Sequence, residues 1–177
     1  LNHNLFSVLG ITFKCLYHEN GLKKAESGDL KGAIQDFTKS ITANPNQVIS
    51  HHDRALARKL SKDYEGAIED YTRVIKLNNE LKGEDDEWLE NIYLERGYCR
   101  FLAQDDKGAI EDLNRSIDID PTNSINFLNR GIAESNLGNF KNAIINYKKF
   151  LDIEPNNKIV YGSLCKASYF LKEYKES

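Results

Sequence analysis

The sequence contains no methionine, only three prolines and three cysteines, and no apolar run that approaches the length of a membrane span. A transmembrane helix needs about 20 consecutive apolar residues, so we expect no membrane insertion. Cys15, Cys99 and Cys165 are odd in number and widely spaced, which argues against a disulfide framework and favours a reducing, cytoplasmic compartment. Because even residue 1 is not methionine, we expect a chain that has been processed or trimmed.

An excess of positive charge is also missing, because the net charge is -3. A nucleic-acid binder needs a basic face to displace counterions from phosphates, so we expect no nucleic-acid partner. The sequence has no H-E-x-x-H, no glycine-rich phosphate loop and no paired-cysteine motif. We therefore predict that the chain is not an enzyme and has no catalytic residue, no cofactor and no metal. Cys15-x-x-His18, with His51 and His52 in the next repeat, is the only metal-like cluster, and we expect its histidines to lie too far apart for joint ligation.

One six-residue segment occurs four times in the sequence. The copies are GAIQDF (32–37), GAIEDY (66–71), GAIEDL (108–113) and NAIINY (142–147). Their alanines are 34, 42 and 34 residues apart, and a period of this length predicts a stack of repeats. Each period holds two helical patterns joined by a short polar turn. One helix pair cannot bury its apolar face alone, so neighbouring pairs must stack.

Other positions of the period repeat too, if each unit is numbered so that its alanine is position 20. Position 4 is mostly aromatic: Tyr17, His51, Tyr93, Phe127 and Tyr161. Position 8 is small: Gly21, Ala55, Gly97, Gly131 and Cys165, and we expect Cys99 and Cys165 to be buried thiols. Position 32 holds all three prolines of the chain, Pro45, Pro121 and Pro155, where a helix must stop.

This pattern resembles the tetratricopeptide repeat (TPR) family, whose motif is W-x2-L-G-x2-Y, then A-x3-F, then P. The resemblance covers residues 14 to about 176. It implies an all-α, right-handed helical solenoid of antiparallel helix pairs with four full repeats and a fifth first helix. We expect an apolar N-terminal segment (1–13), then the solenoid (14–177). Its parts are repeats 14–47, 48–81, 90–123 and 124–157, an insert at 82–89, and a partial or capping repeat at 158–177 whose end, KEYKES (172–177), looks like a turn.

The insert coincides with the missing proline, because position 32 of the second repeat is Asn79. We therefore expect the second helix of that repeat to run on to Lys82 and to end at Gly83. Asp85 or Asp86 would cap a lengthened next helix. Trp88 near its start either packs between the long helices or anchors a partner.

A charged pair of positions follows the same period. Position 23 holds Asp36, Asp70, Asp112 and Asn146, and position 7 holds Asn20, Arg54, Arg96, Arg130 and Leu164. If each aspartate pairs with the arginine of the next repeat, no aspartate or arginine at these positions is left unpaired. We therefore predict the ion pairs Asp36–Arg54, Asp70–Arg96 and Asp112–Arg130. A buried guanidinium is costly unless a carboxylate faces it. The alternative is that these residues are solvated surface charges, which contribute little to stability.

The family resemblance also implies a concave groove lined by the first helices at positions 2, 5, 9, 12 and 13, of which we take positions 2, 5 and 9. In the three central repeats these positions are Ile49, His52, Leu56, Asn91, Leu94, Tyr98, Ile125, Leu128 and Ile132. They are mostly apolar, so we expect them to bind a peptide or an amphipathic helix. Some of them could instead be buried between helices.

The family members that hold the C-terminal carboxylate of a chaperone use a clamp of lysine, asparagine and arginine. The corresponding residues here are His18, Leu22, Asp53, Asn91 and Glu95, or one repeat later His52, Leu56, Glu95, Ile125 and Asn129. None of them matches, and the acidic ones would repel a carboxylate. We therefore expect a protein-protein interaction scaffold or adaptor for another kind of ligand. Two alternatives stay open. The solenoid could self-associate or fill its own groove with residues 1–13, or it could be the helical regulatory domain of a larger enzyme complex.

Overall fold

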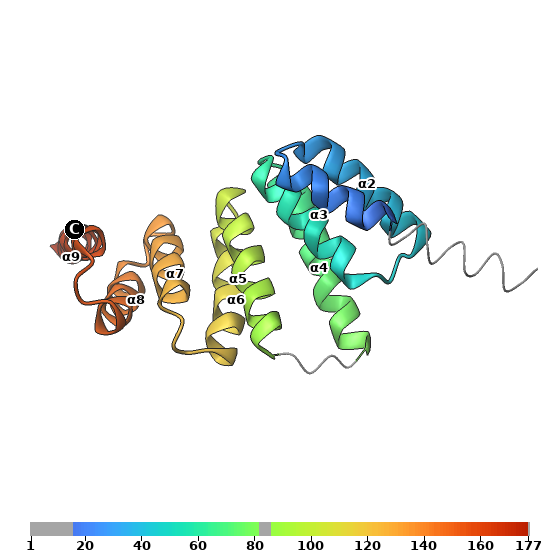
Figure 1. Ribbon diagram of the computed structural model, residues 1–177. Helices are drawn as coiled ribbons and strands as arrows, with labels where there is room; N and C mark the ends of the chain where they lie inside the picture. Colours follow the sequence, from blue (N-terminus) through green and yellow to red (C-terminus); the bar gives the residue numbers. More distant parts are fainter. Residues whose placement is uncertain (1–15, 82–85, 177) are drawn as a thin grey trace, which may run out of the picture. The chain divides into compact units, whose positions relative to one another are not determined.

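The computed structural model describes residues 16–81 and 86–176, and this part of the chain is helical apart from short connections (Figure 1). The predicted N-terminal segment 1–13, Cys15 and the insert residues 82–85 lie outside the described residues. The helices are residues 16–26, α2 (Leu30–Ala43), α3 (Val48–Leu60), α4 (Tyr64–Leu81), α5 (Asp86–Leu102), α6 (Asp106–Ile119), α7 (Ser124–Asn136), α8 (Phe140–Ile153) and α9 (Lys158–Glu176). Consecutive helices pack in pairs, so the predicted all-α fold of stacked helix pairs is confirmed.

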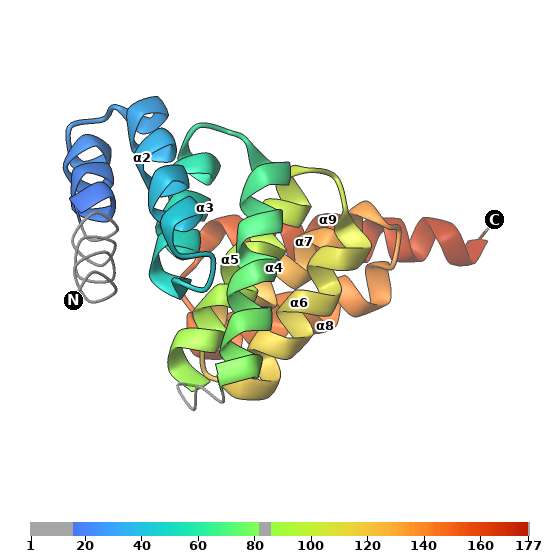
Figure 2. The same ribbon diagram turned by 90° about the vertical axis from the view of Figure 1, so that its right-hand side faces the viewer.

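The chain divides into two compact units, Leu1–Glu84 and Asp85–Ser177. In the first unit, residues 16–26 and α2 form one repeat, and α3 and α4 form the next; Figure 2 shows α2 and α3 side by side. In the second unit, α5 and α6 form a repeat, α7 and α8 form another, and α9 packs on α8. We describe each unit by itself.

The second helix of each of the first three repeats starts at an aspartate that caps it, whereas Asn139 at the start of α8 makes no such bond. Asp29 accepts a hydrogen bond from the Gly32 amide at 2.9 Å, and Asp105 accepts the equivalent bond from Gly108 at 2.9 Å. The turn before α2 contains Gly28 at φ +82°, in the left-handed region that favours glycine. The glycine that opens each GAI segment therefore supplies the amide that the cap requires, while the following alanine is fully buried in every copy.

Three labelled helices are longer than the others: α4 and α5, as predicted, and α9, which was not predicted to be long. α4 runs past Asn79 to Leu81, so the predicted extension is confirmed to within one residue, and Gly83 lies outside the described residues. α9 runs to Glu176, so the turn expected at 172–177 is wrong. This stretch has no glycine or proline, and its lysine and glutamate residues favour a helix. Trp88, on the first turn of α5, is half-buried.

The small residue at position 8 lets the two helices of a repeat approach closely. A Cβ atom added to Gly21 would lie 2.6 Å from the ring of Phe37, and one added to Gly131 would lie 2.7 Å from the ring of Tyr147. Both rings are almost completely buried. Each glycine therefore leaves the space that the aromatic ring at position 24 fills.

The predicted ion pairs form between other partners. Arg54 Nε and Nη2 donate to the two carboxylate oxygens of Asp70 at 2.9 and 2.6 Å, and Arg96 donates to Asp112 in the same geometry at the same distances. The predicted pairs Asp36–Arg54 and Asp112–Arg130 are therefore wrong, because Arg54 bonds Asp70 and Asp112 bonds Arg96. The third predicted pair, Asp70–Arg96, would join residues of different units, and both of its members have these partners within their own repeats.

The reason is a third position that the sequence analysis did not include. Position 11 lies one turn after position 7 on the same helix and holds Lys24, Arg58, Arg100 and Glu134. Arg58 Nη1 donates to Asp70 at 2.8 Å, and Arg100 Nη1 lies 3.2 Å from Asp112. We call positions 7, 11 and 23 of one repeat its polar trio. In the second and third repeats the trio is a buried carboxylate between two guanidinium groups.

The first repeat keeps this balance with lysines. Asn20 replaces the arginine at position 7, and Asp36 accepts hydrogen bonds from Lys24 at 2.5 Å and from Lys39 at 2.8 Å. These two ammonium groups lower the pKa of Asp36. The buried carboxylate therefore stays ionised and paired without the arginine that the sequence analysis assigned to it.

The fourth repeat explains why its aspartate is absent. Its trio is Arg130, Glu134 and Asn146, so the carboxylate has moved from position 23 to position 11. Arg130 Nε donates to the amide oxygen of Asn146 at 2.8 Å, and the buried Glu134 accepts hydrogen bonds from Asn139 and Asn142. An aspartate at 146 would bring a second buried carboxylate to a site with one cation, which is costly.

At two junctions an arginine donates to an uncharged group of the preceding repeat. Arg54 Nη1 donates to Thr38 of the preceding repeat at 3.0 Å, and Arg130 Nη1 donates to Asn114 at 2.6 Å. Beside them, Ser40 bonds Ser50 at 2.9 Å. The arginines therefore do bridge the junctions, as predicted, but their junction partner is the neutral residue at position 25.

The polar trio predicts a specific rescue in the fourth repeat. The substitution Glu134→Arg should lower the free energy of unfolding, because it puts two cations beside Asn146 with no carboxylate between them. Adding Asn146→Asp should recover about 1–3 kcal/mol, because it recreates the trio of the second and third repeats. Urea denaturation followed by circular dichroism measures both. If the double variant is no more stable than Glu134→Arg alone, the trio does not act as a unit.

A second double-mutant cycle distinguishes the observed pairing from the pairing across repeats. Because Arg96 bonds Asp112, the cost of Arg96→Leu with Asp112→Leu should fall short of the sum of the single costs by about 1–3 kcal/mol. Arg96→Leu with Asp70→Leu should be additive to within about 0.5 kcal/mol. Coupling of Arg96 to Asp70 instead of Asp112, measured in the same denaturation experiments, would contradict the structure.

Candidate functional site

The nine residues predicted to line a groove keep some exposure, and none of them is buried. They lie on the first helices of three repeats: Ile49, His52 and Leu56 on α3; Asn91, Leu94 and Tyr98 on α5; and Ile125, Leu128 and Ile132 on α7. Ile49 and Ile125 are 44% and 43% exposed, which is high for isoleucine. Leu128 and Ile132 pack partly against the core of the second unit. The first three belong to one unit and the other six to the other.

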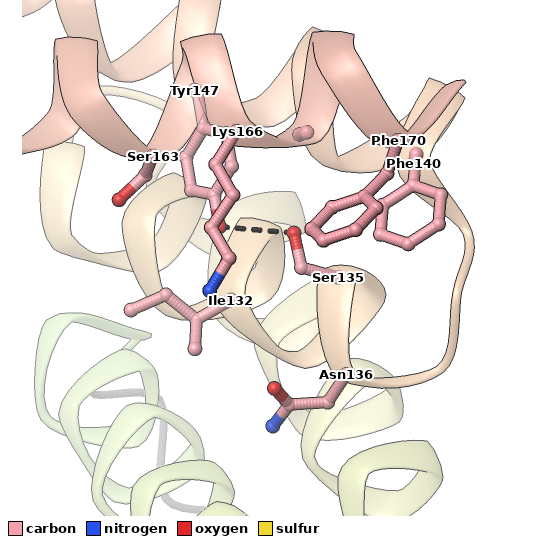
Figure 3. A pocket seen from close by; sticks show the side chains of 9 residues that line it. Ile132, Ser135, Asn136, Phe140, Tyr147, Ser163, Lys166 and Phe170 are labelled. Atoms are coloured by element: carbon pink, nitrogen blue, oxygen red, sulfur yellow. Dashed lines mark hydrogen bonds between the residues drawn. The ribbon is translucent and has the colours of Figure 1, made fainter. Parts of the chain in front are cut away.

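A hollow of about 470 Å³ lies in the second unit, where α7, α8 and α9 meet (Figure 3). It is lined by Ile132, Ser135, Asn136, Phe140, Tyr147, Ser163, Lys166, Ala167 and Phe170. Only Ile132 was among the nine predicted residues. The sequence analysis missed the others because it took positions 2, 5 and 9 of three repeats and treated 158–177 as a cap. The shared positions could have revealed them, since Lys166 has the place of Ile132 one repeat later.

The walls of this hollow combine apolar side chains with polar groups from Ser135, Asn136, Ser163 and Lys166. The rings of Phe140 and Phe170 stack with their centroids 5.3 Å apart. The hydroxyl groups of Ser135 and Tyr147 are hydrogen-bonded at 3.1 Å, as the dashed line in Figure 3 marks. Burial raises the pKa of Tyr147 although the bond from Ser135 opposes this, so the phenol is neutral. Lys166 is the only charged residue among the nine that line the hollow, and Figure 3 shows its amine reaching toward Ile132.

The first helices of the first unit carry a different polar group. Asp53 lies between two imidazoles, with His18 Nε2 at 2.7 Å from one carboxylate oxygen and His52 Nδ1 at 2.8 Å from the other. Burial raises the pKa of Asp53, but the hydrogen bonds from His52 and His18 lower it by more, so the pKa of Asp53 is below its ordinary value. The two histidines were expected to be too far apart for joint metal ligation, and the structure places a carboxylate between them. Within residues 16–81 and 86–176, no group of three or more His, Cys, Asp or Glu is arranged to hold a metal ion.

Two further expectations concern the cysteines and the membrane. Cys99 is fully buried, as predicted, but the prediction of a buried Cys165 is wrong. Position 8 is covered by the second helix of a repeat, and the described part of the chain places no such helix over α9. Across the described ranges, none of the helices combines the length and the apolar character that a bilayer crossing requires.

Comparisons with known proteins agree with this architecture. A family model for the tetratricopeptide repeat matches residues 49–81 and 126–157. The crystal structure of MamA protein superposes with a TM-score of 0.82 at 24% identity, covering 93% of this chain and 85% of that one. The crystal structure of YrrB, described as a TPR protein with an unusual peptide-binding site, has a TM-score of 0.75 at 11% identity, covering 88% and 76%.

A third similar structure is the second TPR domain of human RPAP3, solved by NMR in complex with the HSP70 peptide SGPTIEEVD. Its TM-score is 0.60 at 29% identity, and the match covers 69% of this chain and 95% of that domain. No curated protein sequence matches the chain. Residues 49–81 and 126–157 are therefore tetratricopeptide repeats, and the chain shares its fold with these structures.

Proposed function

We propose that this protein is an interaction scaffold, and that it holds a segment of a partner protein in the hollow between α7, α8 and α9. The observation that carries the proposal is the composition of this hollow, with aromatic and aliphatic walls and a single cation, Lys166. Pockets that bind a ligand combine apolar walls with a few fixed polar groups in this way. Its volume of about 470 Å³ suits a few side chains of a peptide.

The charge of the hollow indicates the chemistry of the ligand. An apolar side chain would lie against the stacked Phe140 and Phe170, where it is removed from water. Lys166 would then meet a carboxylate, because no acidic residue is among those that line the hollow. The expected ligand is a peptide or amphipathic helix with an acidic residue next to apolar ones. In this proposal the six predicted groove residues of the second unit extend the contact along α5 and α7.

Two of the similar structures concern peptide binding, which supports a peptide ligand here. The RPAP3 domain was solved with a chaperone peptide that ends in Glu-Glu-Val-Asp, and YrrB is described as having an unusual peptide-binding site. The chaperone peptide is not the ligand we expect for this chain. The lysine, asparagine and arginine clamp expected for such a tail is absent, and its central asparagine is replaced by Asp53. Like-charge contact would disfavour a terminal carboxylate at that point.

Substitution of the lysine tests the site and its charge preference together. The ligand would be captured from lysate of the source cell, its binding segment mapped, and the synthetic segment titrated by calorimetry. Lys166→Glu should weaken binding by about tenfold or more, because it replaces attraction by repulsion in a partly apolar site. Lys149→Glu, an equal charge change at an exposed site outside the hollow, should alter affinity by less than about twofold.

Two other outcomes separate the alternatives. Equal effects of the two substitutions would contradict the hollow as the site. A chain that captures nothing while it sediments as a dimer would favour self-association. Ile125→Glu, at a predicted groove residue with an exposed side chain, tests the wider surface without disturbing the core. Its effect should be smaller than that of Lys166→Glu.

A further inference from the structure

α9 carries a face that none of the helices in residues 16–81 and 86–176 covers. Its residues recur every three or four positions and therefore share one side of the helix: Lys158, Tyr161, Cys165, Tyr169 and Lys172. All five are exposed, and the tyrosines are 47% and 60% exposed in that order. On the opposite side, Val160 and Ala167 are buried in the core of the second unit. We call the five exposed residues the outer face of α9.

The outer face has the residue types of a face that is covered in the other repeats. It includes positions 4 and 8 of the fifth repeat, an aromatic residue and a small one. In the other four repeats the position-8 residue is buried, and at Gly131 an added Cβ atom would lie 2.7 Å from the ring of Tyr147 on the second helix. A Cβ atom added to Gly162, which follows Tyr161, would meet nothing within 4 Å. α9 therefore has the surface that receives a second helix, with the space for it open.

We propose that the outer face of α9 docks an acidic amphipathic helix of a partner protein, which packs as the second helix of the fifth repeat. The charge of the face carries the choice of partner. From 158 to 172, α9 has three lysines and no acidic residue. Lys158 and Lys172 lie at the two ends of the face, about 21 Å apart along the helix axis at 1.5 Å per residue. A complementary helix has acidic residues near both ends and apolar residues between them.

The polar trio adds a condition on the middle of the docked helix. Positions 7 and 11 supply the cations beside the buried aspartates of the second and third repeats, but in α9 they are Leu164 and Ser168. Ser168 Oγ donates to the backbone oxygen of Leu164 at 2.8 Å. An aspartate at position 23 of the docked helix would find no cation at these two positions, which is costly. The partner is expected to place an uncharged residue there, as Asn146 does before Tyr147 in α8.

The same charges disfavour a second copy of the chain on this face. Lys158 and Lys172 lie seven residues before and after Cys165. Two outer faces that meet antiparallel around Cys165 would therefore place Lys158 of one copy against Lys172 of the other. A parallel contact would place each lysine against itself. Like charges would face each other at both ends in either case.

This surface is separate from the hollow of the proposed function. None of its five residues is among the nine that line the hollow, although both surfaces include parts of α9. The two sites can therefore be tested independently.

A pair of synthetic peptides tests the charge preference. The acidic peptide is an amphipathic helix with Ala-x3-Tyr at its centre, an asparagine before the tyrosine and two glutamates at each end; the basic peptide has lysine in place of each glutamate. Titrated against the intact protein by fluorescence anisotropy, the acidic peptide should bind at least about tenfold more tightly. Lys158→Glu/Lys172→Glu should remove or reverse that preference. Lys148→Glu/Lys149→Glu, an equal charge change at exposed sites of α8, should keep it.

The thiol of Cys165 reports where the peptide binds. A saturating amount of the acidic peptide should slow the labelling of Cys165 by N-ethylmaleimide at least about fivefold, because a docked helix covers the thiol. Mass spectrometry of the fragment that contains Cys165 measures this rate. Cys165→Tyr, which fills the space over position 8, should weaken binding about tenfold or more. Cys165→Ser, of nearly the same size, should bind as wild type does.

Three results would overturn the inference. The first is that wild type does not bind the acidic peptide. The second is binding that leaves the labelling of Cys165 unchanged; if Lys166→Glu then abolishes it, the peptide occupies the hollow. The third is a dimer in sedimentation that Cys165→Tyr dissociates, which would assign the face to a second copy. If Lys166→Glu fails to affect the ligand of the hollow while Cys165 is protected by the peptide, only the proposed function fails.

Discussion

The pairing of a buried aspartate with two basic groups inside each of the first three helix pairs is the constraint on which the rest of the fold depends. A buried charge is costly unless an opposite charge and hydrogen bonds replace the solvent. Asp70 and Asp112 meet that condition with two arginines each, and Asp36 meets it with two lysines. These groups come from both helices of one repeat, so the charge is balanced within the helix pair. A stacking contact can then be small and neutral, as the hydroxyl pair of Ser40 and Ser50 illustrates.

The fourth repeat shows that the balance of charge is retained when its members change. Glu134 supplies the carboxylate, Asn146 keeps the hydrogen bond to Arg130, and two asparagines satisfy the displaced acid. Burial lowers the pKa of Arg130, while Glu134 and Asp118 oppose that shift. If position 23 is compared alone, Asn146 is read as the loss of the buried carboxylate. The three positions together describe one unit with a different distribution of charge.

The features that were predicted correctly from the sequence are those that a single position of the repeat determines. Alanine, glycine and proline fix the period because each is limited by local geometry, as at Gly131, where a Cβ atom would meet Tyr147. The ion-pair partners could not be predicted in the same way, because pairing depends on which of two neighbouring helices a guanidinium reaches. The sequence analysis did not include position 11, which supplies the second basic group of the trio. The hollow was not predicted for another reason. Lys166 and Phe170 belong to a helix that the motif presented as an incomplete repeat.

The first helices of the two units carry different charged groups. In the second unit the charge of the hollow comes from Lys166. In the first unit both carboxylate oxygens of Asp53 are bonded to imidazoles, those of His18 and His52. Because the polar trio balances its charge within one repeat, such a difference can be placed in one repeat without a matching change in the trio of the next.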